Sequence, residues 1–140
     1  MIVSATAKPT PTRALLDTHA FLWAVLEPHK LSNQARALIQ NPNVGLLVSA
    51  ASIWEIATKY RIGKLPDAQL VVQDFQRSIA GLRAESLNIT LDHASRAGSF
   101  IADHKDPFDR MLAAQAILER VPLITNDPLI RTFSGVTVFW

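Results

Sequence analysis

His104-Lys-Asp-Pro-Phe-Asp-Arg110 opens the stretch that decides the fold of this chain, and an apolar segment joins it to Val121-Pro-Leu-Ile-Thr-Asn-Asp127. Asp106 is a good helix N-cap, and the proline after it suits the first helical position. The residues from Met111 to Leu118 are apolar on almost every side, which predicts a buried helix. Asp109 would then lie at the mouth of that helix, where a charged carboxylate is costly unless it is paired.

Length and composition indicate one globular domain. The chain has 140 residues, 49% of them hydrophobic, which is enough for one core and too few for two domains. Cysteine is absent, so disulfides and thiolate metal sites are excluded. The four histidines lack the spacing of a zinc site, and His19, His93 and His104 are interpreted as hydrogen-bonding residues. The net charge of +2 is only a weak hint of affinity for a polyanion.

No segment of the sequence approaches the roughly 20 apolar residues of a membrane span. Residues 1–12 are rich in Ala, Thr and Pro and lack the pattern of a secretory signal. They are predicted to be a flexible N-terminal extension before a single domain at 13–140. A cytoplasmic location is expected.

Short apolar runs alternate with helical patterns along the rest of the chain. Such alternation predicts βαβ crossovers and a mainly parallel sheet with helices on both faces, an α/β fold of three α/β/α layers. Strands are expected at 13–17, 44–48, 84–89, 122–125 and 136–139, and helices at 18–27, 32–40, 50–60, 67–80, 90–102 and 107–118, with a short helical turn from 128.

Four acids are predicted to meet at one edge of this sheet. Asp17 ends the first strand, Glu55 lies two turns into the helix after the second, and Asp127 follows the fourth strand by two residues. Asp109 begins a helix that starts at the same edge. Ligand sites of open parallel sheets lie beyond the carboxyl ends of the strands, which is where these side chains would gather.

Each acid also has an ordinary structural interpretation. Asp17 and Asp127 could simply cap the helical turns that follow them. Glu55 could pair with Lys59 at the favourable i,i+4 spacing, and Asp109 could complete a capping box with Asp106.

The conjunction of the four favours a shared cation, because helix caps have no reason to converge at one edge. Like charges within a few ångströms repel by several kcal/mol at an effective dielectric of about 20. A divalent ion removes that repulsion, and Mg²⁺ or Mn²⁺ prefers oxygen ligands.

The chain resembles the PIN domain, and within it the VapC-type toxin ribonucleases of toxin–antitoxin pairs. The resemblance runs from about Arg13 to Trp140. It rests on Leu15-Leu-Asp-Thr-His19, Ser49-Ala-Ala-Ser-Ile-Trp-Glu-Ile56, Gly63-Lys-Leu65, Asp106-Pro-Phe-Asp-Arg110 with Ala113-Ala-Gln-Ala116, and Thr125-Asn-Asp127. The segment Ile101–Lys105 departs from the family pattern, which usually has Leu-Pro there.

The resemblance implies a Mg²⁺- or Mn²⁺-dependent endoribonuclease, with RNA as substrate, a cognate antitoxin as partner and a homodimer as assembly. By motif position, the metal-binding and catalytic acids would be Asp17, Glu55, Asp109 and Asp127. Thr125 would be a polar neighbour and Asp106 an accessory acid.

Basic residues near these acids are candidates for binding RNA phosphates: Lys59, Arg61, Lys64, Lys105 and Arg110. Lys59 and Arg61 could equally complement the dipole at a helix C-terminus. The helix at 18–27 carries Phe21, Leu22 and Trp23 and is either plain core or a groove for an apolar partner helix.

Two other classes of function remain open on the sequence. A phospho-acceptor receiver domain also places acids at strand ends, but it needs an acidic pair near the first strand and a lysine after a late strand, and Pro128 stands where that lysine would be. A catalytically inactive PIN domain, acting only as a binding module, is the stronger rival. The presence of all four acids argues against it.

Overall fold

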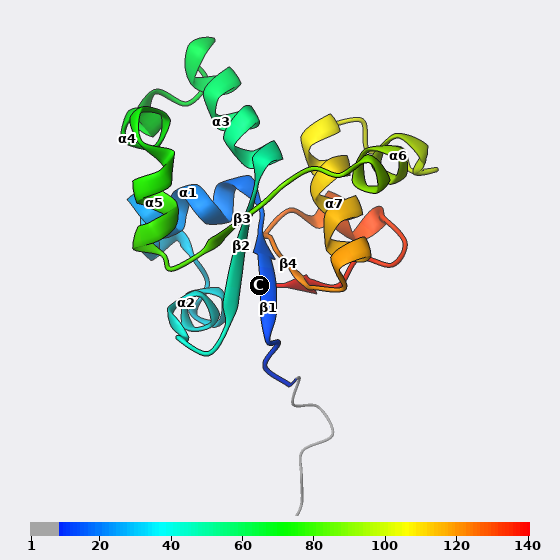
Figure 1. The fold of residues 1–140 in the computed structure, drawn as a ribbon, viewed down its shortest axis with the longest axis horizontal. Coiled ribbons are helices and arrows are strands. Elements are labelled where there is room, and N and C mark those ends of the chain that lie inside the picture. Colours follow the sequence, from blue (N-terminus) through cyan, green and yellow to red (C-terminus); the bar gives the residue numbers. More distant parts are fainter. Residues whose placement is uncertain (1–8) are drawn as a thin grey trace, which may run out of the picture.

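The computed structural model describes residues 9–140, and a parallel five-stranded sheet lies at its centre (Figure 1). The strand order is β3-β2-β1-β4-β5. Every neighbouring pair is parallel, with β1 between β2 and β4. The strands are β1 (Arg13–Leu16), β2 (Gly45–Ser49), β3 (Glu85–Leu87), β4 (Leu123–Ile124) and β5 (Val138–Phe139). The predicted α/β architecture with a central parallel sheet is confirmed.

Helices cover both faces of the sheet (Figure 1). On one side lie α1, α2, α4 and α5, and on the other α6 and α7, while α3 extends beyond the carboxyl ends of the strands. The α-helices are α1 (Thr18–Leu26), α2 (Asn33–Gln40), α3 (Ala50–Arg61), α4 (Gln69–Gln73), α5 (Phe75–Gly81), α6 (Leu91–Ser99) and α7 (Pro107–Glu119). Short 3-10 turns are η1 (Pro28–Lys30), η2 (Pro66–Ala68) and η3 (Pro128–Thr132).

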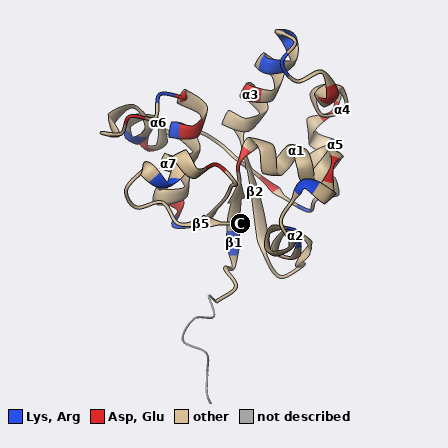
Figure 2. Cartoon of the chain, turned by 180° about the vertical axis from the view of Figure 1, so that it is seen from behind, with Lys and Arg blue, Asp and Glu red and all other residues tan. Residues whose placement is uncertain are grey.

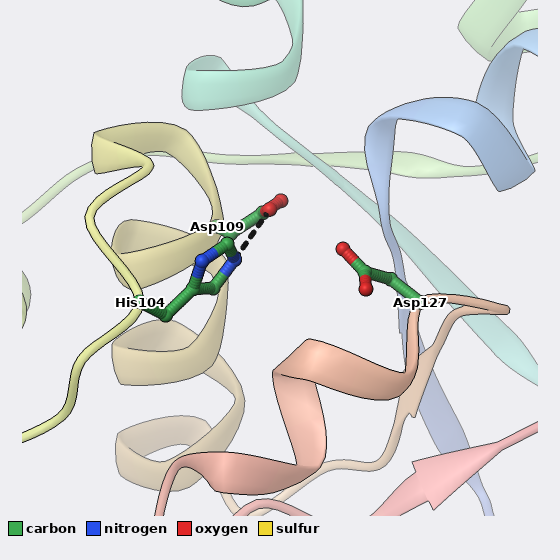
Figure 3. Close-up of side chains that lie close together, drawn as sticks. All are labelled: His104, Asp109 and Asp127. Atoms are coloured by element: carbon green, nitrogen blue, oxygen red, sulfur yellow. Dashed lines mark hydrogen bonds and ion pairs between the residues drawn. The ribbon is translucent and has the colours of Figure 1, made fainter.

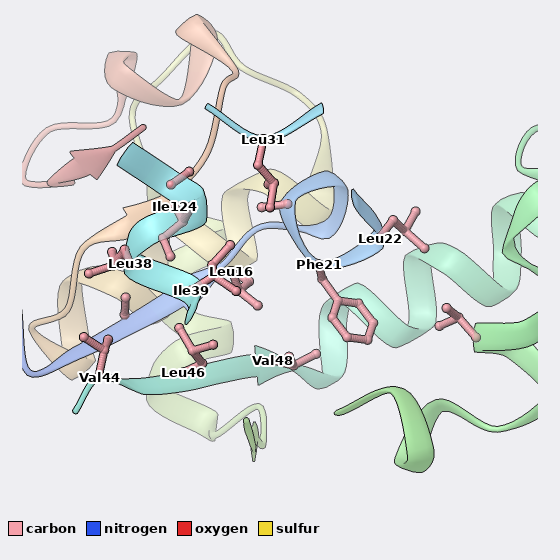
Figure 4. Packing of buried hydrophobic residues seen from close by; sticks show 14 of the residues in the cluster. Leu16, Phe21, Leu22, Leu31, Leu38, Ile39, Val44, Leu46, Val48 and Ile124 are labelled. Carbon is pink, nitrogen blue, oxygen red and sulfur yellow. The ribbon is translucent and has the colours of Figure 1, made fainter. Parts of the chain in front are cut away.

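Two hydrophobic cores result from the alternation of side chains along the strands. Leu16 and Val48 point to the core beneath α1 and α2, seen in Figure 4, together with Phe21 of α1. Leu15 and Leu47, one residue earlier in each strand, point to the second core beneath α7. Because neighbouring strand residues face opposite sides, the buried part of such a strand must be apolar on both faces, as Ala14–Leu16 and Leu46–Val48 are.

The chain departs from the predicted element boundaries in one helix above all. The helix expected at 67–80 is divided into η2, α4 and α5, and the break lies at Asp74, which has φ −151° and ψ 73°. The Asp74 side chain accepts a hydrogen bond from the Arg77 amide (3.1 Å) and caps α5. Aspartate favours such a cap over a helix interior because its short side chain competes for backbone amides.

Other boundaries shift by a few residues. The helix α6 ends at Ser99 rather than at Ala102, and the third, fourth and fifth strands are shorter than predicted. The prediction that the helix is buried from Met111 to Leu118 is wrong at its last turn, where Leu118 is 37% exposed. Full burial is confined to Leu112–Ala116, the run with small side chains, where α7 packs against α6 and the sheet.

Most of the predicted N-terminal extension, residues 1–8, lies outside the described residues. Thr12 is tied to the fold, because its carbonyl accepts a hydrogen bond from the Gly45 amide (2.8 Å). Within residues 9–140, no helix combines the length and apolar character that crossing a bilayer requires.

Candidate metal centre and its surroundings

The candidate site lies beyond the carboxyl ends of β1 and β4, the two strands at which the order of the sheet reverses. Asp17 follows β1 directly, and Thr125 and Asp127 follow β4. The N-terminus of α7 with Asp109 and the N-terminal half of α3 with Glu55 complete it. Crevices of this kind are the usual ligand sites of parallel α/β sheets.

Asp17 is both a helix cap and a member of the site. Its Oδ1 accepts a hydrogen bond from the Ala20 amide (2.7 Å), and its side chain is 6% exposed. Burial, with smaller contributions from the charges of Glu55 and Asp127, raises the pKa of Asp17 to about 6. Hydrogen bonds from Thr125 and Ala20 oppose the rise without cancelling it. The carboxylate is therefore held, ionised at neutral pH, in a place that disfavours its charge.

Glu55 is the most buried charge of the site, at 3% exposure. Thr18 donates a hydrogen bond to its Oε1 (2.5 Å), and the Thr18 hydroxyl also lies 3.1 Å from that of Ser52. Lys59, one turn on, forms the i,i+4 ion pair with Glu55. Burial alone would lower the pKa of Lys59. The hydrogen bond and the charge of Glu55 raise it instead, and the charges of Asp106 and Asp109 contribute in the same direction.

Asp109 faces a histidine. Its Oδ2 lies 2.8 Å from Nε2 of His104, which precedes it by five residues. Burial, together with the charges of Asp106 and Glu55, raises the pKa of Asp109 to about 6, although His104 acts in the opposite direction. Asp106 caps α7, with Oδ1 accepting from the amides of Phe108 (2.8 Å) and Asp109 (3.2 Å). The Asp109 carboxylate thus faces His104, whereas a capping box would require it to accept a hydrogen bond from the backbone amide of Asp106.

Asp127 lies opposite this pair (Figure 3). Its Oδ1 caps η3 by accepting from the Leu129 amide (2.9 Å), and its own amide donates to Thr125 Oγ1 (3.0 Å). One ligand atom each of His104, Asp109 and Asp127 lie within 4.8 Å of one another, close enough to share a cation.

The four predicted acids lie beyond the carboxyl ends of the strands, but Asp17 and Glu55 are not in the group at metal-binding separation. The charges of Glu55 and Asp127 raise the pKa of Asp17, and the charge of Glu55 raises that of Asp109, so the acids are close enough to interact electrostatically. The three residues already at metal-binding separation, however, include His104, which the sequence analysis treated as an ordinary hydrogen-bonding residue. The only available signal was its position two residues before Asp106, and that gave no reason to expect its ring to face Asp109.

The predicted basic residues have different environments. Figure 2 shows Lys and Arg positions at the C-terminal end of α3. Arg61 and Lys64 are exposed at and beyond the C-terminal end of α3, and Lys105 is exposed in the loop before α7. Lys59 is engaged with Glu55. Arg110 was a candidate for phosphate binding, and here the structure differs: its guanidinium donates to four backbone carbonyls, of residues 97, 100, 102 and 104.

A partly exposed aromatic pair lies next to two site acids in the sequence and was not predicted. Trp54, which is 61% exposed, and Phe108 meet edge to face with ring centroids 4.9 Å apart. Each ring immediately precedes a site acid, Glu55 and Asp109 respectively. The pair therefore joins the segments of α3 and α7 that carry Glu55 and Asp109.

The apolar helix α1 serves two purposes. Phe21 and Leu22 are buried in the core, whereas Trp23 and Leu26 are only partly buried. Leu22, Trp23 and Leu26 line a cavity of about 530 Å³ with the segment at 64–68. Both interpretations of this helix, core and groove, thus have support in the structure.

Comparison with known proteins gives a consistent result. The PIN domain family model matches residues 14–135. Ribonuclease VapC16 of Mycobacterium tuberculosis is 40% identical over 110 residues, which cover 69% of this chain and 74% of that protein. Ribonuclease VapC22 of the same organism is 30% identical over 122 residues, covering 86% and 92%.

Solved structures show the same fold. The crystal structure of VapBC-5 from Mycobacterium tuberculosis, a member of the VapBC family of toxin–antitoxin systems, superposes with a TM-score of 0.61 at 20% identity, over 92% of this chain and 97% of that one.

Proposed function

Because this chain belongs to the PIN-domain family, we propose that it is an endoribonuclease, the toxin of a toxin–antitoxin pair, which uses a divalent cation to hydrolyse RNA phosphodiester bonds. The observation that carries the proposal is the convergence of Asp17, Glu55, Asp109 and Asp127 from four separate segments. Two of these acids have pKa values raised to about 6 in a site that is largely buried.

The site fits a hard divalent cation. Two carboxylates 4.8 Å apart, the limit of the His104–Asp109–Asp127 group, repel by about 3 kcal/mol at an effective dielectric of about 20. Lys59 compensates only part of this negative charge, since it is bound to Glu55. An oxygen-rich donor set of this kind suits Mg²⁺ or Mn²⁺ better than a softer metal.

The chain's own residues then have distinct tasks. Asp17, Asp109 and Asp127 would hold the cation, directly or through water. Glu55, anchored by Thr18 and Lys59, is placed to complete the cluster or to orient the attacking water. The cation would lower the pKa of that water and offset charge that accumulates on the scissile phosphate. In-line attack would leave a 5′-phosphate and a 3′-hydroxyl.

RNA has to approach an acidic site, so cations and aromatic rings around it are required. The exposed side chains of Arg61, Lys64 and Lys105 would bind phosphates, and their contribution should weaken with salt. The Trp54–Phe108 pair offers a surface on which an unpaired base can stack. We leave Arg110 out of this set, because the backbone already takes up its donors.

The protein partner would be an antitoxin. The cavity lined by Leu22, Trp23 and Leu26 also has charged side chains on its wall, among them Glu27 and Lys64, and it would suit an amphipathic partner helix. A basic antitoxin segment would complement the acidic site, and a homodimer is the expected assembly.

The test is cleavage of a structured RNA with Mg²⁺, with Mn²⁺ and with chelator. The wild type should cleave only with metal and leave 5′-phosphate ends. Asp17→Asn should lose at least 100-fold in rate, by analogy with other groups that stabilise transition-state charge, whereas Asp92→Asn, an exposed acid of α6, should cleave as the wild type does. Equal cleavage by wild type and Asp17→Asn, or none with any metal, would favour the inactive binding module.

A further inference from the structure

The loop between α6 and α7 is held by a single side chain. Arg110 donates through Nε to the carbonyl of Ala97 (2.9 Å), through Nη2 to Phe100 (2.7 Å), and through Nη1 to Ala102 (3.3 Å) and His104 (3.0 Å). These acceptors span the end of α6 and the loop as far as His104. Because all of them are backbone carbonyls, the guanidinium determines the path of the loop whatever its side chains are.

Two neighbouring aromatic rings pack against one side of this arginine. Its guanidinium carbon lies 5.8 Å from the ring centroid of Phe100 and 6.0 Å from that of Phe133, and the two rings are 4.9 Å apart. Hydrogen bonds from a charged donor strengthen where water is excluded. The His104 ring packs on Phe133 at 5.6 Å, so the same cluster supports its face.

The polar end of the His104 ring is directed at Asp109. Nε2 lies 2.8 Å from Oδ2, and the imidazole is only 12% exposed. This contact leaves the other carboxylate oxygen of Asp109 available on the side from which Asp127 approaches (Figure 3). Carboxylates that ligate metals are commonly fixed by a further hydrogen bond of this kind.

We propose that Arg110 and His104 are positioning residues: Arg110 holds the loop, the loop presents His104, and His104 fixes the carboxylate of Asp109 for the cation. This inference rests on the proposed function and deepens it. Neither residue needs to touch RNA. The arrangement explains why an arginine beside a site acid spends its donors on the backbone rather than on phosphate.

The test measures Mn²⁺ affinity alone, without RNA, from the EPR signal of free Mn²⁺. His104→Leu should weaken binding about tenfold, at the lower end of the effect of removing such partners. His104→Gln, whose amide can donate to Asp109, should restore it to within about threefold of the wild type. His29→Leu, a matched change at an exposed histidine, should bind as the wild type does. Equal affinity of His104→Leu and the wild type would overturn the proposal.

Arg110→Lys keeps the charge but not the fork of donors, and should weaken Mn²⁺ binding about as much as His104→Leu. If Arg110 acts through His104, the variant that carries both Arg110→Lys and His104→Leu should bind Mn²⁺ no more weakly than the weaker-binding of the two single variants. Additive losses of affinity in the double variant would refute this. Arg96→Lys is the control, since Arg96 also lies 5.8 Å over the Phe100 ring. Should Arg110→Lys fail to fold, the His104 series decides the proposal without it.

Direct ligation by His104 is the competing possibility, and a spectroscopic measurement separates the two. Pulsed EPR of bound Mn²⁺ should show no directly coordinated nitrogen. A coordinated ¹⁴N that disappears in His104→Gln would overturn the positioning role. A wild type that binds no Mn²⁺ would instead refute the proposed function, and this inference with it, whereas a wild type that binds and cleaves while His104→Leu matches it would refute the inference alone.

Discussion

Replacing Asp17 by asparagine is expected to stabilise the metal-free protein at neutral pH while abolishing its activity. The carboxylate is 6% exposed, and burial with the charges of Glu55 and Asp127 raises its pKa from 3.8 to about 6. Asparagine is isosteric and as good an N-cap as aspartate, so the hydrogen bond from Ala20 can be kept. What the substitution removes is the cost of ionising a buried group.

The sign and size of the effect follow from linkage. The folded protein holds this proton more tightly than the unfolded chain, so the cost is nearly absent below pH 3.8, grows as the pH rises towards 6, and is constant above that. At about 1.4 kcal/mol per pKa unit, the full cost at pH 7 is on the order of 3 kcal/mol, falling to about 0.5 kcal/mol at pH 4. The gain for Asp17→Asn should follow the same curve.

Urea denaturation of chelator-treated protein at pH 7 and pH 4 is the assay. We expect Asp17→Asn to exceed the wild type in unfolding free energy by about 1–3 kcal/mol at pH 7, and to match it at pH 4 to within about 0.5 kcal/mol. Saturating Mg²⁺ should stabilise the wild type more than the variant. Asp92→Asn removes an exposed charge and should change little at either pH. If Asp17→Asn were no more stable than the wild type at pH 7, or gained equally at both pH values, the reasoning would be wrong.

Three further substitutions test other parts of the account. Lys59→Gln leaves the buried charge of Glu55 without its ion-pair partner and should cost about 1–3 kcal/mol in urea denaturation; no loss of stability would mean that the pair is not needed. Lys64→Gln should leave stability within about 0.5 kcal/mol but reduce the slope of log RNA affinity against log salt by about one; an unchanged slope would exclude Lys64 from the phosphate-binding surface. Asp106→Ala should lose about 1 kcal/mol through the missing cap of α7; Asp103→Ala, at an exposed loop position, is its control, and equal losses in both would contradict the capping role.

The sequence predicted those features that depend on local chemistry. The short apolar runs Ala14–Leu16 and Leu46–Val48, each followed by a helical pattern, indicated buried strands, and the end of the first run placed Asp17 at the carboxyl end of β1. Asp106 followed by proline located the start of α7. These signals are strong because caps and apolar runs are properties of a few consecutive residues.

Two kinds of feature were not predicted from the sequence. Some depend on contacts that are made only in the folded chain, and others arise where two local conformations suit the same residue equally well. Asp74 could lie within a continuous helix or cap a new one, and in the folded chain it caps α5. The partnership of His104 and Asp109 needs the loop path that Arg110 imposes, and nothing in the pattern distinguishes a carbonyl-binding arginine from a phosphate-binding one. The partners of the basic and imidazole side chains of the site can therefore be identified only from the three-dimensional structure.

Anomalous diffraction from crystals soaked in Mn²⁺ would show where the protein binds the cation. We expect one strong peak among the carboxylates of Asp17, Asp109 and Asp127, with metal–oxygen distances of about 2.1–2.3 Å, and its loss in Asp17→Asn crystals treated identically. Crystals that show Mn²⁺ only elsewhere on the protein, or none at concentrations that support cleavage, would contradict this expectation.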